Sequence, residues 1–279
     1  MEQKTIAIIG LGLIGGSMAK ALKQKTPHKV LGTDKDPDVC RKALQDGAVD
    51  EIITTQQLGQ ADVVLMALFP RIVLELSQDV VSHMRPGAIL TDLCGVKGCV
   101  CGPLDTLAQQ HGIHFVGGHP MAGREFPGYD ASLPSLYEGG SMILTPMSTS
   151  TPEVLDFLQE FFLSLGFAQV VRTTPENHDK MIAFTSQLAH VVSSAYIKSP
   201  EALSHGGYSA GSYKDLTRVA RLNEHMWSEL FLDNAKPLVN EIDEIIRHLT
   251  EYRDAIASGD RQLLTDLLRD GRERKEAIG

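Results

Sequence analysis

The sequence predicts an α/β domain followed by an all-helical domain, with the boundary at residue 174. Two observations support this fold class. Short apolar runs alternate with helical patterns as far as residue 172, which is typical of βαβ units and a parallel sheet. From Pro175 onward, apolar residues recur only with helical spacing. We therefore expect one domain over residues 1–174 and a second over residues 175–279.

The expected strands of the first domain are apolar runs bounded by glycine, proline or acidic residues. The run at residues 61–68 is largely apolar, and continuous runs of this kind suit a parallel strand that is buried on both faces. The expected strands lie at residues 5–9, 29–33, 50–53, 61–68, 88–93, 114–118, 142–146 and 167–172.

Helices are expected between these strands because apolar residues there follow helical spacing. Pro70 and Pro152 stand at first helical positions, where proline is tolerated, and Gly166 follows the last of these helices. The expected helices lie at residues 18–23, 37–46, 70–84, 103–111 and 151–165. In the second domain they lie at residues 176–198, 213–222, 224–233, 236–257 and 260–274, and loops are expected at residues 126–140 and 199–212.

A glycine-rich stretch separates the first expected strand from the first helix. It has the spacing G-x-G-x-x-G in the strand–turn–helix context of a Rossmann-type dinucleotide-binding domain. In such a turn Gly10 permits the tight bend, Gly12 lets the backbone approach a pyrophosphate, and Gly15 lets the helix pack on the strand. The helix N-terminus then faces the phosphates. The cofactor-binding residues expected here are Gly10, Gly12, Leu13, Ile14 and Gly15.

The acid that would bind the ribose hydroxyls is Asp34, at the end of the second expected strand. It follows Gly15 by 19 residues, close to the spacing of about 20 that the fingerprint requires. A turn residue or helix N-cap before Pro37 is the alternative. A carboxylate at this position repels a 2′-phosphate, so the sequence favours NAD over NADP, although the adjacent Lys35 weakens that preference.

Composition excludes several classes of function. The net charge of −9 disfavours nucleic acids and anionic membranes as partners, because both select for basic surfaces. No run approaches the roughly 18 apolar residues of a membrane span, and no signal peptide is expected, so we expect a cytoplasmic protein. The four cysteines lack the paired spacing of a zinc site, and no metal is expected.

His119 is the first candidate for catalysis. It directly follows an expected strand, and ligands of open α/β sheets bind beyond the carboxyl ends of the strands. A histidine there can accept a proton from a substrate hydroxyl while hydride leaves the same carbon. A surface histidine without a role is the alternative, since the chain has ten histidines.

Polar groups also interrupt the apolar helices of the second domain. His190 lies on an otherwise apolar helix, where a hydrogen-bonded core histidine is the alternative to a functional one. Asp215 and Arg218 are spaced for an ion pair on one helix. Arginine is also the natural bidentate partner of a substrate carboxylate. These side chains would supply a site for a small anionic substrate.

Seven motifs together resemble the prephenate/arogenate dehydrogenases of tyrosine biosynthesis, and the resemblance runs from residue 6 to about residue 250. The segments around His119 and Arg218 are specific in combination, whereas the glycine loop alone is not. The motifs are GLGLIGGS at 10–17, DLCGVKG at 92–98, GGHPMAGRE at 117–125, LYEGGSMILTP at 136–146, SQLAH at 186–190, KDLTRVA at 214–220 and MWSELFLDN at 226–234.

The resemblance implies an oxidative decarboxylation in which hydride leaves C4 of a cyclohexadiene ring for NAD(P)+ and carbon dioxide leaves C1. Carried over by position, His119 would accept the proton of the C4 hydroxyl and Arg218 would bind a substrate carboxylate. His190 would line the pocket, Asp215 would hold Arg218 or its neighbour, and Glu125 would belong to a polar gate.

The sequence departs from the family at two places. The family usually has a serine in the loop where this chain has Gly95, and that serine contacts the catalytic histidine. The family often has S-H-L-P-H where this chain has SQLAH, with Gln187 in place of a histidine. Losing the serine removes one hydrogen bond, worth about 0.5–1.5 kcal/mol. The reaction class is unaffected, but efficiency or substrate choice is expected to differ.

The long apolar helices of the second domain predict a homodimer, since about 105 residues could hardly bury those faces alone. Two other functions remain open from sequence. One is another two-domain NAD(P)-dependent hydroxyacid or imine oxidoreductase. The other is a nucleotide-sensing module that binds NAD without turnover. The change at Gly95 gives it some support, whereas the presence of His119, Arg218, Asp215 and Glu125 together argues against it.

Overall fold

The computed structural model describes residues 2–124 and 126–279, and these divide into two compact units. The first unit runs up to Ile182 and also includes Arg221–Asp233. The second unit comprises Ala183–Ala220 and Asn234–Gly279. The units therefore cross the domain boundary expected at residue 174. Each unit is described by itself below.

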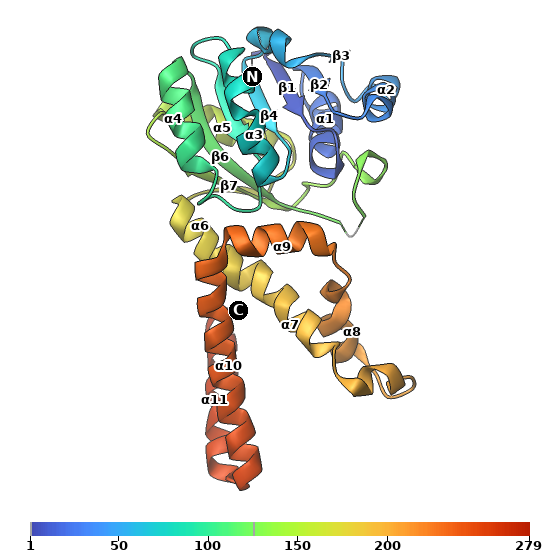
Figure 1. The fold of residues 1–279 in the computed structure, drawn as a ribbon, viewed down its shortest axis with the longest axis vertical. Helices are drawn as coiled ribbons and strands as arrows, with labels where there is room; N and C mark the ends of the chain where they lie inside the picture. Colours follow the sequence, from blue (N-terminus) through green and yellow to red (C-terminus); the bar gives the residue numbers. More distant parts are fainter. Residues whose placement is uncertain (1, 125) are drawn as a thin grey trace. The chain divides into compact units, whose positions relative to one another are not determined.

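Within its described residues, the first unit is built on one sheet of eight strands in the order β3-β2-β1-β4-β5-β6-β7-β8 (Figure 1). Strands β3 to β6 along this order are parallel, β7 runs antiparallel to β6, and β8 is parallel to β7. The strands are β1 (Thr5–Ile9), β2 (Lys29–Thr33), β3 (Glu51–Ile52), β4 (Val63–Met66), β5 (Ile89–Asp92), β6 (His114–Met121), β7 (Ser141–Pro146) and β8 (Gln169–Arg172).

Helices α2 to α5 and α9 begin and end close to the residues that the sequence predicts, whereas α1 begins five residues earlier than expected, at Leu13. Pro70 and Pro152 open α3 and α5, and the side chain of Thr151 caps α5. Short 3-10 helices at Thr55–Gln60 and Tyr129–Ala131 were not expected. The helices are α1 (Leu13–Lys25), α2 (Pro37–Gln45), α3 (Pro70–Ser82), α4 (Cys101–His111), α5 (Pro152–Ser164), α6 (Pro175–Ile182) and α9 (Glu224–Asp233).

Helices cover both faces of the sheet, and each face has its own core. Ile6 and Ile8 of β1 point to one face, where they belong to a cluster that includes Phe161 of α5. Ala7 and Ile9 point to the other face and pack in a second cluster with residues of α3 and α4. Alternate residues of a strand point to opposite faces, so burial on both faces explains the apolar strand runs.

Strand β6 differs from the expectation in a way that matters for the site. It was expected to end before His119, which would then lie on a loop. Instead β6 continues to Met121 and pairs with β7, with His119 opposite Ile143. The antiparallel partner extends the ladder, so the backbone at His119 is fixed by sheet hydrogen bonds.

The second unit is helical, as expected. The long helix predicted at residues 176–198 is interrupted by a π-helical turn at Ala183–Gln187, and such turns are frequent at functional sites. Gly259, with φ of 69°, joins the two long helices in the left-handed conformation. The helices are α7 (Leu188–Tyr196), α8 (Gly211–Thr217), α10 (Ala235–Ser258) and α11 (Arg261–Ala277), with 3-10 turns at Pro200–Ser204 and Arg218–Ala220.

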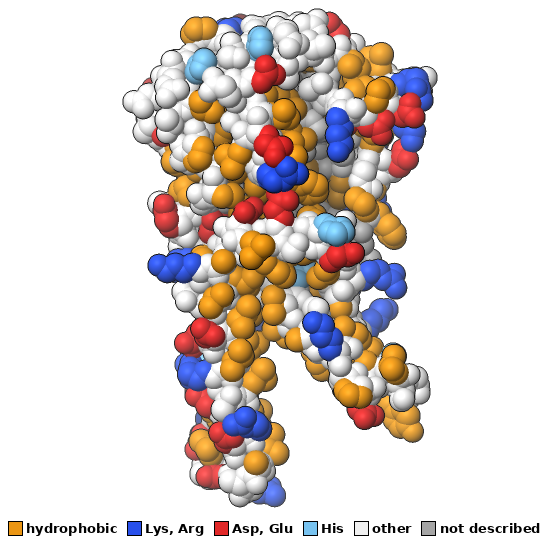
Figure 2. Space-filling view, viewed as in Figure 1, with side chains coloured by type: hydrophobic (Ala, Val, Ile, Leu, Met, Phe, Trp, Pro, Cys, Tyr) orange, Lys and Arg blue, Asp and Glu red, His pale blue; other side chains and the backbone are white. Residues whose placement is uncertain are grey.

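Helices α10 and α11 keep much of their apolar surface exposed in the single chain. Ile246, Leu249 and Ile256 of α10 are each more than half exposed, and Figure 2 shows hydrophobic side chains along these helices. Contiguous apolar surface of this kind marks an interaction site. Among the described residues, no helix is both long and apolar enough to cross a membrane.

Candidate active site

The turn between β1 and α1 requires two of its glycines for steric reasons. Gly10 has φ of 90°, and a Cβ there would lie 2.6 Å from the carbonyl oxygen of Ala67. A Cβ on Gly15 would lie 1.8 Å from the carbonyl oxygen of Gly10. Any side chain at either position would therefore force the turn apart, as the fingerprint predicts.

Gly12 is different, because a Cβ there would meet nothing within 4 Å. This glycine is the N-cap of α1, where no side chain caps the helix and no acid lies in the first turn. The helix N-terminus therefore combines open space with backbone N–H donors. These residues fit a pyrophosphate, which needs both features. Leu13 and Ile14 form the first turn of α1.

Asp34 directly follows β2, and its carboxylate makes two hydrogen bonds to backbone N–H groups. Its Oδ2 accepts a hydrogen bond from the backbone N–H of Leu11 in the glycine turn over 2.7 Å. Its Oδ1 accepts from the backbone N–H of Asp36 over 3.0 Å, which makes it a turn residue as well. A carboxylate has about four acceptor sites, so ribose hydroxyls can still bind. The side chain that caps α2 is that of Asp36.

A buried ion pair anchors the loop that follows β5. Lys97 is fully buried, and its Nζ donates to the carboxylate of Asp92 and, over 2.6 Å, to the carbonyl oxygen of Gly118. Burial alone would lower the pKa of Lys97, but the neighbouring Asp92 raises it above its usual value. Position 117 requires glycine beside this side chain, because a Cβ there would lie 2.2 Å from Oγ1 of Thr145, 2.7 Å from Sγ of Cys101 and 3.3 Å from Cδ of Lys97.

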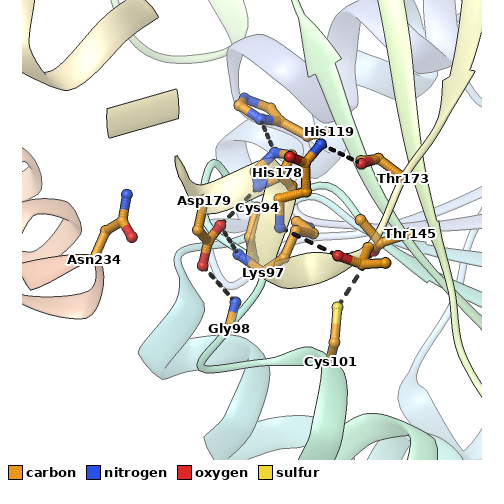
Figure 3. Close-up of polar contacts among 12 residues, drawn as sticks. Cys94, Lys97, Gly98, Cys101, His119, Thr145, Thr173, His178, Asp179 and Asn234 are labelled. Carbon is orange, nitrogen blue, oxygen red and sulfur yellow. Dashed lines mark hydrogen bonds and ion pairs between the residues drawn. The ribbon is translucent and has the colours of Figure 1, made fainter. Parts of the chain in front are cut away.

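His119 belongs to a chain of hydrogen bonds within the first unit (Figure 3). Its Nδ1 lies 2.9 Å from Nε2 of His178, and Nδ1 of His178 lies 2.7 Å from Oδ1 of Asp179. The Asp179 carboxylate also accepts the backbone N–H groups of Lys97 and Gly98 over 2.8 and 2.7 Å. Helix α6 thus connects the catalytic candidate to the loop anchored by Lys97.

The surroundings of His119 favour its neutral form. Burial, followed by the nearby His178 and Lys97, lowers the pKa of His119 well below its usual value. Burial also lowers the pKa of His178, although Asp179 acts in the opposite direction. A Cβ on Gly95 would lie 3.8 Å from Nε2 of His119, in ordinary contact. The Nε2 atom therefore faces the loop position where the family usually has serine.

The second unit contains the other group of expected site residues. Nδ1 of His190 hydrogen-bonds the carbonyl oxygen of Ser186 over 2.8 Å. Burial lowers the pKa of His190, the hydrogen bond to Ser186 acts in the opposite direction, and the charge of Arg218 adds to the lowering. Asp215 and Arg218 are both exposed, and no ion pair joins them in the part of the chain that the structure describes.

The departure at Gln187 has its own local partner. Gln187 lies in the π-helical turn and is buried, and its Oε1 accepts a hydrogen bond from Nδ2 of Asn234 over 2.7 Å. An amide pair therefore occupies this position within the second unit. Glu125, the remaining residue expected at the site, lies outside the described residues.

Of the cysteines near β5, Cys94 and Cys101 are buried and Cys99 is half-buried. Burial raises the pKa of Cys99 and of Cys101 to about 12, and that of Cys94 well above its usual value. Thiols are unreactive when they stay protonated. The described residues contain no group of three or more potential metal ligands.

Two residues of the site were missed from sequence. His178 and Asp179 lie in α6, and no motif in the sequence around them indicates a functional role. Their importance appears only because α6 brings them beside a residue 59 positions away.

Two protein-family models together match residues 18–270 of the chain, apart from residues 172 and 173. The family model described as "Prephenate dehydrogenase, nucleotide-binding domain" matches residues 18–171. The model described as "Prephenate dehydrogenase, dimerization domain" matches residues 174–270. A cyclohexadienyl dehydrogenase of Zymomonas mobilis is 31% identical over 288 residues, which cover 99% of this chain and 96% of that protein. A prephenate dehydrogenase of Bacillus subtilis is 26% identical and is covered to 76% of its length.

Solved structures give the same result. A prephenate dehydrogenase of Aquifex aeolicus, in complex with hydroxyphenyl propionate and NAD+, superposes with a TM-score of 0.88 at 28% identity, covering 100% of this chain and 99% of that one. The arogenate dehydrogenase of Synechocystis superposes with a TM-score of 0.85 at 26% identity, covering 99% and 100%.

Proposed function

The chain belongs to the prephenate dehydrogenase family, and on that premise we propose that it oxidises and decarboxylates prephenate, arogenate or both with NAD+, in tyrosine biosynthesis. The observation that carries the proposal is the placement of His119 on β6. Its Nε2 faces the loop at Gly95, and its pKa is lowered, so the ring is neutral and able to accept a proton.

His119 is the general base in this proposal. It hydrogen-bonds the hydroxyl on C4 of the substrate ring and takes its proton as hydride leaves C4. Carbon dioxide leaves C1, the ring becomes aromatic, and the proton returns to what is now a phenol oxygen. Aromatisation drives the reaction, so a single proton-accepting group suffices. NAD+, when bound, supplies the hydride acceptor.

The cofactor is held by the turn before α1. Gly10 and Gly15 keep the turn closed, while Gly12 leaves its backbone open to the pyrophosphate. Asp34 accepts the ribose hydroxyls and disfavours a 2′-phosphate, which makes NAD the preferred cofactor over NADP.

The residues of the second unit bind the substrate. Arg218 is exposed and pairs with a substrate carboxylate, for which its planar guanidinium is suited. His190 lines the pocket with its ring held by Ser186. Asp215 holds Arg218 or its neighbour in place once substrate is bound, and Glu125 contributes to the polar gate.

The proposal extends to the domain organisation, the oligomeric state and the location of the protein. The functional boundary lies at residue 174, so that residues 1–174 bind NAD and residues 175–279 provide dimerisation and substrate binding. The chain forms a homodimer through its C-terminal helices, consistent with the exposed apolar side chains of α10. It acts in the cytoplasm.

Absorbance at 340 nm with prephenate and arogenate, each with NAD+ and NADP+, tests this function. We expect NADH to form with at least one of the two substrates. Isothermal titration with NAD+ runs in parallel. Binding of NAD+ without turnover of either substrate would contradict the proposal and support a nucleotide-sensing module. Turnover of a hydroxyacid or an imine in the same assay, without turnover of prephenate and arogenate, would indicate a different oxidoreductase.

A further inference from the structure

We propose that His178 and Asp179 are positioning residues that hold His119 in one tautomer, with hydrogen on Nδ1 and a lone pair on Nε2. The use of that lone pair as the base rests on the proposed function. The tautomer itself does not, because it follows from the hydrogen bonds of the first unit alone.

Asp179 fixes the direction of every bond in the chain. It is only 5% exposed, and its two carboxylate oxygens accept the backbone N–H groups of Lys97 and Gly98. A carboxylate whose two oxygens both accept hydrogen bonds from backbone N–H groups acts as an acceptor. Whatever approaches Oδ1 of Asp179 within hydrogen-bond distance must therefore donate.

The side chain within hydrogen-bond distance of Oδ1 of Asp179 is that of His178. Nδ1 of His178 lies 2.7 Å from Oδ1 of Asp179, so Nδ1 carries the hydrogen. His178 is 1% exposed, and burial lowers its pKa, which keeps the ring neutral. A neutral imidazole with hydrogen on Nδ1 has an acceptor lone pair on Nε2. The second ring nitrogen of His178 is thus an acceptor that points at His119.

The same reasoning then sets the tautomer of His119. Its Nδ1 lies 2.9 Å from Nε2 of His178, and the two rings meet edge to face with centroids 5.1 Å apart. Since the His178 atom accepts, Nδ1 of His119 must donate, and its Nε2 is left with the lone pair. A Cβ on Gly95 would lie 3.8 Å from that atom and 3.8 Å from Cδ2 of Leu230, so Nε2 of His119 faces the loop at Gly95.

The hydrogen bond from His119 to His178 contributes more to the orientation of the His119 ring when position 95 is glycine than when it is the serine usual in the family. Glycine offers His119 no side-chain hydrogen bond, so the orientation of the ring depends on the His178 side. When Nε2 takes a proton, the imidazolium still donates through Nδ1 to His178, whose own donor bond ends on the negative Asp179. Orientation of a catalytic histidine by a carboxylate follows the same principle in other enzymes, where a wrong tautomer costs about 10⁴ in kcat.

Nitrogen-15 NMR of histidine-labelled protein near neutral pH reads the tautomer directly. His119→Asn assigns the resonances of the ring. In the unmodified protein we expect Nδ1 of His119 to be protonated and Nε2 to be unprotonated. His178→Gln keeps an acceptor oxygen near the position of Nε2 and should preserve this pattern. His178→Leu removes the acceptor and should move the hydrogen to Nε2 or give a mixture. His28→Gln, a change at another buried histidine, should leave the pattern intact.

Steady-state kinetics completes the test. His178→Leu should lower kcat by about 10²-fold or more, within the range for a lost general base, with the affinity for NAD+ unchanged. His178→Gln should recover most of that loss. Hydrogen on Nε2 in the unmodified protein, or equal losses in both variants, would overturn the proposal. The NMR result stands apart from turnover, so the expected tautomer in a protein inactive towards prephenate and arogenate would contradict the proposed function alone.

Discussion

The carboxylate of Asp34 accepts a hydrogen bond from the backbone N–H of Leu11 over 2.7 Å. This contact joins the end of β2 to the glycine turn after β1, so the residue that would recognise the ribose also stabilises the turn that would hold the phosphates. Changes at Asp34 are therefore expected to affect cofactor choice and turn geometry together, and the two effects have to be separated.

Asp34→Ser is expected to raise the ratio of kcat/KM with NADP+ to kcat/KM with NAD+, because it removes the negative charge that repels a 2′-phosphate. Asp34→Asn is the matched control, since it removes the charge but keeps an oxygen that can accept the Leu11 N–H. A higher ratio in both variants would show that the negative charge of Asp34 causes the preference for NAD+. An unchanged ratio in both would show that another residue discriminates.

His119→Asn is expected to lower kcat by about 10²–10⁴-fold, the usual contribution of a general base. Affinity for NAD+, measured by titration, should not change, because the glycine turn is intact. His111→Asn is a suitable control at the end of α4. Turnover close to that of the unmodified protein would refute the role of His119.

Lys97→Met is expected to destabilise the first unit by about 3–5 kcal/mol, because it leaves the buried Asp92 carboxylate without its cation. Urea unfolding followed by circular dichroism measures this loss. Lys42→Met provides the matched control, since its pair with Asp130 is exposed and contributes little. A loss no larger than that of the control would contradict a structural role for the Lys97 pair.

The free energy of unfolding is expected to fall as the pH drops below about 6.5, and His28 contributes to this fall. Burial lowers the pKa of His28 in the folded protein from the ordinary value of 6.5. The unfolded chain then binds the proton first, so acid favours unfolding. Urea titrations at about pH 7 and about pH 5.5 should show a smaller drop for His28→Gln. An equal fall in the free energy of unfolding in the unmodified protein and in His28→Gln would exclude His28 as a contributor.

Arg218→Ala is expected to raise the KM for the cyclohexadiene substrate while leaving the KM for NAD+ unchanged. Arg218→Lys should recover only part of the affinity, because an ammonium cannot make the bidentate pair. Arg221→Ala, which changes an exposed arginine three residues away, serves as the control. Unchanged substrate affinity in Arg218→Ala would mean that the carboxylate binds elsewhere.

Much of the fold could be predicted because its signals are local. The apolar runs marked the strands of the sheet, and the proline residues at 70 and 152 marked the starts of α3 and α5. Gly10 and Gly15 were assigned from spacing alone, and the structure gives the steric reason for both. The π-helical turn at Ala183–Gln187 could not be predicted, because its residues have ordinary helical spacing.

The sequence by itself determined the class of the fold, the nucleotide-binding turn and the identity of His119 as a candidate, since each depends on neighbours within a few residues. Only the tertiary structure decided that His119 lies inside β6, that Lys97 is buried, and that hydrogen bonds join His119 to His178 and His178 to Asp179. The physical reason is that the protonation and orientation of a side chain depend on its burial and its hydrogen-bond partners. In this protein those partners come from strands and helices far apart in the chain.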